Sequence, residues 1–377
     1  PVEKFEMAPF NEYFLDIEFR LKKKKGLLPK GYLIAWEQLP LINFNTMKLE
    51  FDLNISQENY PKLHDVTETD NEIVITGNDF EIIFSKKTAT MDSWTFQGKN
   101  ILLRGPKPNF WRTPTDNDFG NNMPKRMAVW KHATDEAQVN DIKVDNYDTS
   151  VGIEVFYNFP SVESMGSILY VIYGDGRILV YNNFEIEKGT LPNMPKVGIS
   201  MQIPKEFDAM TWFGRGPHEN YLDRKSSAKV DIYSGKVSDQ FHPYVRPQES
   251  GNKTDVRWAT FRNVAGDGLL VRGLLSLNAS HYLQEDYDHG FGEMKSGATG
   301  NIKTTKQQRH SIDMVERELI NLDIDLIQMG LGGEDSWWAQ PLEKYQIKPK
   351  DYDYSFTLMP IKSDENPVEL NKNSFLK

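Results

Sequence analysis

Two adjacent indoles end a Gly-rich segment, and their chemistry suits them to bind a ligand. The segment, GLGGEDSWW, occupies residues 330–338 and ends in Trp337 and Trp338. A large aromatic ring on a turn can stack on a flat apolar face, such as one side of a pyranose, while its N–H meets a hydroxyl. The competing interpretation is that both rings anchor a core or an interface, which is the commoner use of tryptophan.

A second cluster, FWRTPTDNDFG at residues 110–120, contains oxygen ligands. Asp116, Asn117 and Asp118 could together bind a hard cation. The spacing departs from an EF-hand, because Gly120 comes one place early and no glutamate closes the loop. A turn capped by hydrogen bonds from these short polar side chains is the interpretation we favour.

A third cluster, WFGRGPHENYLDRK at residues 212–225, contains the adjacent pair His218 and Glu219. They could act as acid and base, but neighbouring residues on an extended segment point in opposite directions. No second histidine follows at the HExxH spacing, which excludes a zinc protease. A buried salt-bridge network explains the charges equally well, through Arg215, Glu219, Asp223 and Arg224.

A fourth cluster, FHPYVRPQESGN at residues 241–252, predicts a rigid loop and nothing more specific. The sequence has no cysteine, and therefore no thiolate nucleophile or thiolate metal site. It also lacks a Gly-rich phosphate loop, a nucleophile elbow and a cluster of histidines.

The elements that must position these clusters are strands. Apolar residues alternate with polar ones along most of the chain, and one such strand, with Leu322, Ile324 and Leu326 on one face, leads directly into the Gly-rich segment. Turn chemistry predicts two hairpins, at residues 168–186 around Gly174–Gly176 and at residues 263–271 around Asp267-Gly268. One helix is expected at residues 125–133, opened by Pro124. The pattern predicts an all-β fold.

Composition excludes several classes of partner. The chain has 377 residues, a net charge of −10 and an isoelectric point near 5.3, without a basic stripe, so neither nucleic acid nor a membrane surface is an expected partner. No apolar run approaches the roughly 20 residues that span a bilayer. We expect a soluble protein and leave its compartment open between cytoplasm and periplasm. The chain begins at Pro1, which suggests a processing boundary.

The distribution of polar, turn-rich sequence suggests two unequal domains. Residues 1–56 hold a few strands, too few for a complete sandwich, and are expected to be part of one. Residues 57–71 are polar and are predicted to form a linker. Residues 72–377 continue as strands without a second break, as a single large sandwich would.

Taken in order, the four clusters closely resemble the C-terminal part of glycoside hydrolase family 2 β-galactosidases. The matching segments are WRTPTDNDFG at 111–120, GRGPHENYLDR at 214–224, PYVRPQESG at 243–251 and GGEDSW at 332–337. Residues 31–38, GYLIAWEQ, resemble the end of the immunoglobulin-like domain that precedes the last domain of that family. The resemblance thus covers nearly the whole chain.

The resemblance implies a partial immunoglobulin-like β-sandwich followed by a large antiparallel β-supersandwich of the galactose mutarotase-like type. In that family this domain packs on a (β/α)₈ barrel, which supplies both catalytic glutamates. The position of Trp337 lines the sugar site, and the loop that begins at Gly120 and Asn121 lies near its mouth. Trp338 departs from the family, where a smaller residue often follows, and is a further candidate for sugar contact.

The barrel itself is missing from this sequence, which shows no alternation of strands and helices. Retaining glycosidases need two carboxylates about 5 Å apart, so we expect no catalytic residue here. The resemblance then implies a non-catalytic C-terminal portion of a β-galactosidase, whose parent hydrolyses terminal β-D-galactosides. Because that family binds any Mg²⁺ or Na⁺ through the barrel, the resemblance also implies no cofactor and no strong metal site in this chain. Expected partners are a β-galactoside or another carbohydrate, the barrel, and further copies in a homo-oligomer.

Two functions of other classes remain as alternatives. One is an aldose epimerase of the mutarotase-like fold that uses His218 and Glu219 as acid and base. The other is a stand-alone carbohydrate-binding module.

Overall fold

The computed structural model describes residues 11–41, 60–187, 190–287, 310–335 and 339–373. Strands dominate these residues, which confirms the prediction of an all-β fold. The chain divides into two compact units, one made of residues 1–55 and 366–377 and the other of residues 56–365. No helix within the described ranges is long and apolar enough to cross a membrane.

The described part of the first unit contains one hairpin and one short helix. Strand β1 (Phe14–Arg20) pairs antiparallel with β2 (Leu33–Pro40), and α5 (Pro367–Asn373) lies near the C-terminus. The predicted boundary at residues 56 and 57 falls within 42–59, outside the described residues, and stays a prediction.

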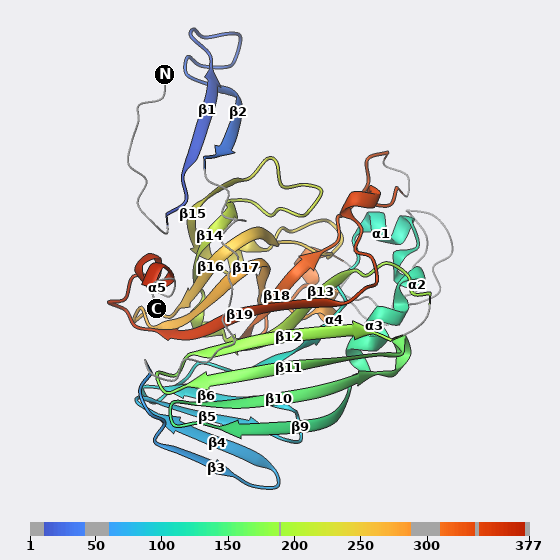
Figure 1. Cartoon of the computed structure of the whole chain (residues 1–377). Coiled ribbons are helices and arrows are strands. Elements are labelled where there is room, and N and C mark those ends of the chain that lie inside the picture. Colours follow the sequence, from blue (N-terminus) through green and yellow to red (C-terminus); the bar gives the residue numbers. More distant parts are fainter. Residues whose placement is uncertain (1–10, 42–59, 188–189, 288–309, 336–338, 374–377) are drawn as a thin grey trace. The chain divides into compact units, whose positions relative to one another are not determined.

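The second unit begins with a five-stranded antiparallel sheet, drawn in blue in Figure 1. Its strands follow one another in chain order: β3 (Asp65–Glu68), β4 (Glu72–Gly77), β5 (Phe80–Ser85), β6 (Thr90–Phe96) and β7 (Lys99–Asn100). Strand β3 lies inside the stretch predicted as a linker, so this part of the prediction was wrong. Its polar residues form an edge strand because backbone hydrogen bonds to β4 need no apolar side chains.

A larger antiparallel sheet of 12 strands forms the rest of the unit. Its strands are β8 (Arg104–Asn109), β9 (Gln138–Asn146), β10 (Ser150–Phe159), β11 (Ser164–Tyr173), β12 (Ile178–Ile186), β13 (Lys196–Pro204), β14 (Ala209–Gly216), β15 (Lys229–Lys236), β16 (Lys253–Arg262), β17 (Gly268–Ser280), β18 (Leu319–Gln328) and β19 (Tyr352–Ile361). The main path runs β15-β14-β16-β17-β19-β12-β11-β10-β9, and the trio β8-β13-β18 joins it through β17.

Strand β17 makes this branch because its two halves have different partners. Residues 268–272 pair with β19, whereas residues 276–280 pair with β18. The sheet therefore forks, and β8, β13 and β18 form a separate surface within it.

Both predicted hairpins are present, since β11 pairs with β12 and β16 pairs with β17. The helix predicted at residues 125–133 is instead two helices, α2 (Met123–Arg126) and α3 (Ala128–Asp135). They meet at Met127, whose backbone φ of −112° lies outside the helical range. Two further short helices are α1 (Asp116–Gly120) and α4 (Gln284–Tyr287).

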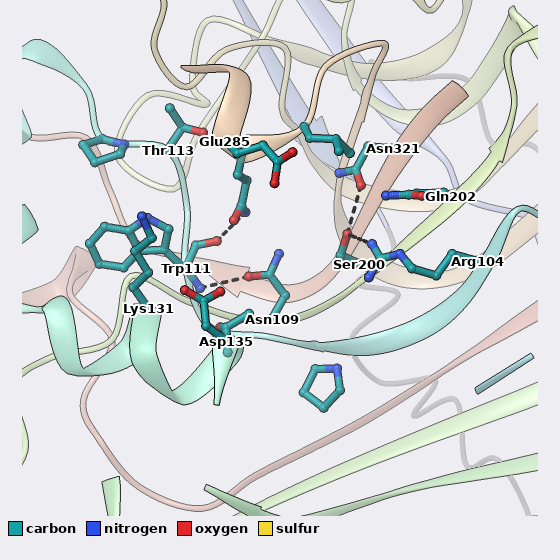
Figure 2. A pocket seen from close by; sticks show the side chains of 15 residues that line it. Arg104, Asn109, Trp111, Thr113, Lys131, Asp135, Ser200, Gln202, Glu285 and Asn321 are labelled. Carbon is teal, nitrogen blue, oxygen red and sulfur yellow. Dashed lines mark hydrogen bonds between the residues drawn. The ribbon is translucent and has the colours of Figure 1, made fainter. Parts of the chain in front are cut away.

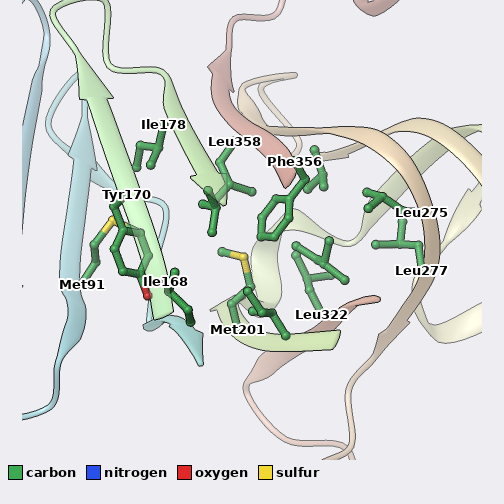
Figure 3. Packing of buried hydrophobic residues seen from close by; sticks show 14 of the residues in the cluster. Met91, Ile168, Tyr170, Ile178, Met201, Leu275, Leu277, Leu322, Phe356 and Leu358 are labelled. Carbon is green, nitrogen blue, oxygen red and sulfur yellow. The ribbon is translucent and has the colours of Figure 1, made fainter. Parts of the chain in front are cut away.

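One hydrophobic core joins the two sheets, as Figure 3 shows. Met91 of β6 packs beside Tyr170 of β11, and the ring of Tyr170 lies 5.5 Å from that of Phe84. Farther along, Met201 and Leu322 bring the apolar faces of β13 and β18 to the same core. The other faces of these two strands are polar, and they face the candidate sites.

Candidate functional site

The second and third sequence clusters contact the Gly-rich segment that follows β18, and the fourth cluster contacts the second. Trp337 and Trp338 lie outside the described residues, so their predicted contacts with sugar remain untested. The two ends of their loop, residues 330–335 and 339–341, are described. These ends show how the loop that carries both tryptophans is held.

Asn117 connects the two ends of this loop. Its side-chain amide donates one hydrogen bond to the carbonyl of Leu331 at 2.9 Å and another to the carbonyl of Ala339 at 2.8 Å. Both amide hydrogens are used, because an amide nitrogen has two donors. The side chain therefore fixes the separation of residues 331 and 339, between which both tryptophans lie.

Asp223, from the third cluster, holds the same loop. Its carboxylate accepts a hydrogen bond from the backbone N–H of Gly332 at 2.8 Å. Gly332 has a φ of +67°, and a Cβ there would lie 2.7 Å from the carbonyl oxygen of Ala339. Only glycine fits this conformation and this space.

Helix α1 places Asn117 against the loop. Thr115 caps the helix and Asp118 completes the capping box. The carboxylate of Asp118 also pairs with Arg112 at 2.9 Å, and both side chains are fully buried. Asp118 is thus engaged in a helix cap, as the favoured capped-turn interpretation predicted, and in a buried ion pair as well. The described residues contain no group of three His, Cys, Asp or Glu side chains that could hold a metal ion.

Residues of the fourth cluster support the other side of α1. The side-chain amide of Gln248 accepts from the backbone N–H of Asp116 at 3.0 Å and donates to its carboxylate at 3.1 Å. Arg246 lies 3.8 Å from the centre of the Phe119 ring, a cation–π contact. This rigid loop therefore helps to position α1.

The predicted site residues Gly120 and Asn121 lie on the same short helix. Gly120 is its last residue and Asn121 caps it, with its N–H donating to the carbonyl of Asn117 at 2.9 Å. Arg126 donates to both the backbone and the side-chain oxygen of Asn121. These residues adjoin the Asn117 bridge, and their contact with sugar stays a prediction.

His218 and Glu219 have separate partners, which argues against their use as an acid–base pair. A ring nitrogen of His218 lies 2.9 Å from the hydroxyl of Ser227. Glu219 accepts hydrogen bonds from Tyr244 and from the N–H of Gly251 and pairs with Arg224. Burial raises the pKa of Glu219, but these bonds outweigh it and hold the pKa below its usual value.

The prediction of a salt-bridge network in the third cluster was confirmed for one ion pair and was wrong for the other residues. Glu219 and Arg224 do pair, but Arg215 pairs with Asp255 and Asp223 binds the Gly332 backbone. Sequence proximity suggested a local network, whereas strand pairing between β14 and β16 brings Asp255 to Arg215.

A group of buried charges was not anticipated from the sequence. The ammonium of Lys196 lies 3.0 Å from Asp323 and 3.3 Å from Asp325. Glu249 is 7% exposed and accepts from the amide of Asn278 at 2.9 Å; burial raises its pKa to about 7, although Arg112 and Lys196 oppose the shift. The alternation along β13 and β18 was visible in the sequence, but it could not show that their polar face is buried.

Comparison with known proteins gives the family. The model described as "Beta galactosidase small chain" matches residues 76–358, and the one described as "Beta-galactosidase, domain 4" matches residues 1–42. The match over residues 76–358 thus identifies the antiparallel all-β unit as a small-chain domain. The chain belongs to the β-galactosidase small chain family.

Relatives named β-galactosidase match along most of the chain. Those of Priestia megaterium and Pseudoalteromonas haloplanktis are 32% and 27% identical over 357 and 360 residues. These matches cover 93% and 92% of this chain but 32% of each relative. The chain therefore spans about a third of the length of these relatives.

Solved structures with a similar arrangement include a putative aldose 1-epimerase from Escherichia coli K12 and a galactose 1-epimerase from Lactobacillus acidophilus. Their identities are 7% and 9% and their TM-scores 0.42 and 0.39. The similarity covers 79% and 80% of this chain and 100% and 98% of those chains.

Proposed function

We propose that this chain is the non-catalytic C-terminal portion of a β-galactosidase and that it contributes Trp337 to the sugar site of the parent enzyme. The parent hydrolyses terminal β-D-galactosides with two carboxylates of a catalytic barrel on which this chain packs. Family membership and the coverage of one third of each relative support this assignment.

The observation that carries the proposal is the bridge made by Asn117. A ring that stacks on a sugar must be held in place before the sugar arrives, because ordering a loop on binding costs free energy. The bonds from Asn117 to Leu331 and Ala339, together with the bond from Gly332 to Asp223, fix the ends of the loop that carries Trp337.

The test is the substitution Trp337→Ala in the intact enzyme, with Trp338→Ala as the matched control. Loss of an aromatic contact costs about 1–3 kcal/mol, so we expect kcat/KM for a nitrophenyl β-galactoside to fall roughly 5- to 150-fold in Trp337→Ala. A smaller loss in Trp338→Ala assigns the stacking to the first ring. Unchanged kinetics in Trp337→Ala would remove this residue from the site.

A second assay tests the non-catalytic role. The purified 377-residue chain should not hydrolyse a nitrophenyl β-galactoside, because the proposed catalytic carboxylates belong to the barrel. Turnover by this chain alone would contradict the proposal and would direct attention to Glu249, the buried carboxyl whose pKa is raised to about 7.

A further inference from the structure

A cavity of about 560 Å³ lies over the polar surface of β8, β13 and β18 (Figure 2). Helix α3 and the residues at the start of α4 complete its walls. This volume is within the range of small-molecule sites, about 300–1,000 Å³. The cavity lies within the second unit, and the proposed function does not use it.

Strand register places three polar side chains in a row on the cavity floor. Gln202 of β13 pairs with Arg104 of β8 on one side and with Asn321 of β18 on the other. Residues paired across strands project from the same face of a sheet. Ser200, two positions along β13, shares that face and links Arg104 to Asn321 through hydrogen bonds of 3.1 Å each.

Several polar groups around the cavity have hydrogen-bonding capacity left over. The side-chain amide of Gln202 bonds to none of the described residues, and the buried Nε of Arg104 has no partner among them. The amide oxygen of Asn109 accepts from the backbone N–H of Trp111 at 3.0 Å, while its NH₂ has no described partner. The Nε of Arg104 is a costly unused donor, because it is buried and has given up its bonds to water, whereas the free groups of Gln202 and Asn109 can bond to a ligand in the cavity.

The charges of the lining are balanced. Arg104 and Lys131 are positive, and Asp135 and Glu285 are negative. Such a lining favours a neutral ligand over an anion or a cation. Its mixture of amide, guanidinium and carboxylate groups both donates and accepts hydrogen bonds, as the hydroxyls of a sugar do.

We propose that this cavity is a second ligand site that takes a neutral saccharide of one or two sugar units. The row of Arg104, Gln202 and Asn321 supplies the hydrogen bonds to the hydroxyls. Trp111 and the prolines at 108 and 114 supply the apolar part of the wall. None of the described residues of the Gly-rich segment lines this cavity.

The test uses the purified 377-residue chain and titrates it with galactose, glucose, lactose and cellobiose at millimolar concentration. Saturation-transfer-difference NMR detects binding, and isothermal titration calorimetry measures Kd. We expect at least one sugar to bind saturably. Gln202→Leu should weaken it about tenfold, because the amide is lost while the bulk is kept.

Two controls locate the binding. Gln138→Leu makes the same replacement at an exposed position on β9, and Trp337→Ala removes the first ring of the Gly-rich loop; neither should change Kd. Asn109→Asp is a second cavity variant that keeps the acceptor for Trp111 and removes the donor; it should also weaken binding. Circular dichroism and Tm establish that each variant is folded.

Three results would overturn the proposal. The first is no saturable binding of any of the four sugars. The second is binding that survives in Gln202→Leu and Asn109→Asp but disappears in Trp337→Ala, which would place the sugar at the Gly-rich loop. The third is binding of inorganic phosphate or galacturonate in preference to the neutral sugars, which would make the cavity an anion site.

Discussion

The carboxylate of Asp223 accepts a hydrogen bond from the backbone N–H of Gly332, 109 positions farther along the chain, at 2.8 Å. Gly330 lies against the same carboxylate, since a Cβ at that position would approach its oxygen to 2.5 Å. Asn117 bonds to Leu331 and Ala339 of the same loop. The loop is therefore held by side chains from two distant segments, and each contact can be tested separately.

Replacing Asn117 with Asp should loosen this loop. A carboxylate cannot donate, so the carbonyls of Leu331 and Ala339 lose their partners and face a negative charge. We expect a loss of about 1–3 kcal/mol in the free energy of unfolding, measured by urea denaturation. If the proposed function holds, kcat/KM of the parent enzyme should fall as well. Asn71→Asp, in an exposed turn, is the control, and an equal effect there would show that charge alone is responsible.

Gly332→Ala and Gly98→Ala form a matched pair. Both glycines have a left-handed φ, +67° and +75°, so alanine carries a similar backbone cost of about 1 kcal/mol at each. Nothing lies within 4 Å of a Cβ at Gly98, whereas at Gly332 it would meet the carbonyl of Ala339. We expect Gly332→Ala to lose clearly more stability in urea unfolding. Equal losses would mean that the loop has room to adjust.

The ion pair of Arg112 and Asp118 should be costly to break. Both side chains are fully buried, and Asp118 also accepts from the backbone N–H of Thr115 at 2.8 Å. Arg112→Met leaves a buried carboxylate without its partner, which costs about 3–5 kcal/mol. Thermal and urea unfolding measure this loss.

The double variant Arg112→Met/Asp118→Asn provides the control for that pair. Asparagine keeps an oxygen for the Thr115 N–H and removes the unpaired charge. The double variant should therefore be more stable than Arg112→Met alone. If Arg112→Met were as stable as the unchanged chain, the ion pair would have no structural role.

The sequence predicted the strand and the glycine turn that lead to the two tryptophans. It did not predict the distant side chains that bond to this loop. The strand with Leu322 and Ile324 and the glycine turn were both predictable, because alternation and turn residues are local signals. The bond of Asp223 to Gly332 joins positions 109 apart, and no local pattern encodes it. Sequence proximity instead suggested that Asp223 belongs to a network with Arg215.

The polar face of β13 and β18 shows a second feature that the sequence alone could not predict. Alternation correctly placed Leu322 and Ile324 on one face of their strand, but it could not show whether the opposite face meets water or is covered by other segments. In the structure Asp325 is fully buried on that side, because the forked sheet and the segments around it cover both faces. Burial of a polar face depends on tertiary packing, which a strand's own sequence does not show.

Glu249 should make the stability of the chain depend on pH. Its pKa is raised by burial to about 7 in the folded state, against a usual value of 4.5. The folded state therefore binds the proton more tightly than the unfolded state does. Stability from this group is fully present below about pH 4.5 and is lost as pH rises to about 7.

The variant Glu249→Gln isolates this contribution. Because Gln does not ionise, the variant should gain stability relative to the unchanged chain as pH rises from 4.5 to above 7, by up to about 3 kcal/mol. Urea unfolding at pH 5 and pH 8 measures the difference between the two proteins at each pH, which cancels the other titrating groups. A difference that is the same at both values would show that Glu249 titrates near its usual pKa. A difference that falls with pH would mean that the carboxylate is stabilised by Asn278 and its charged neighbours.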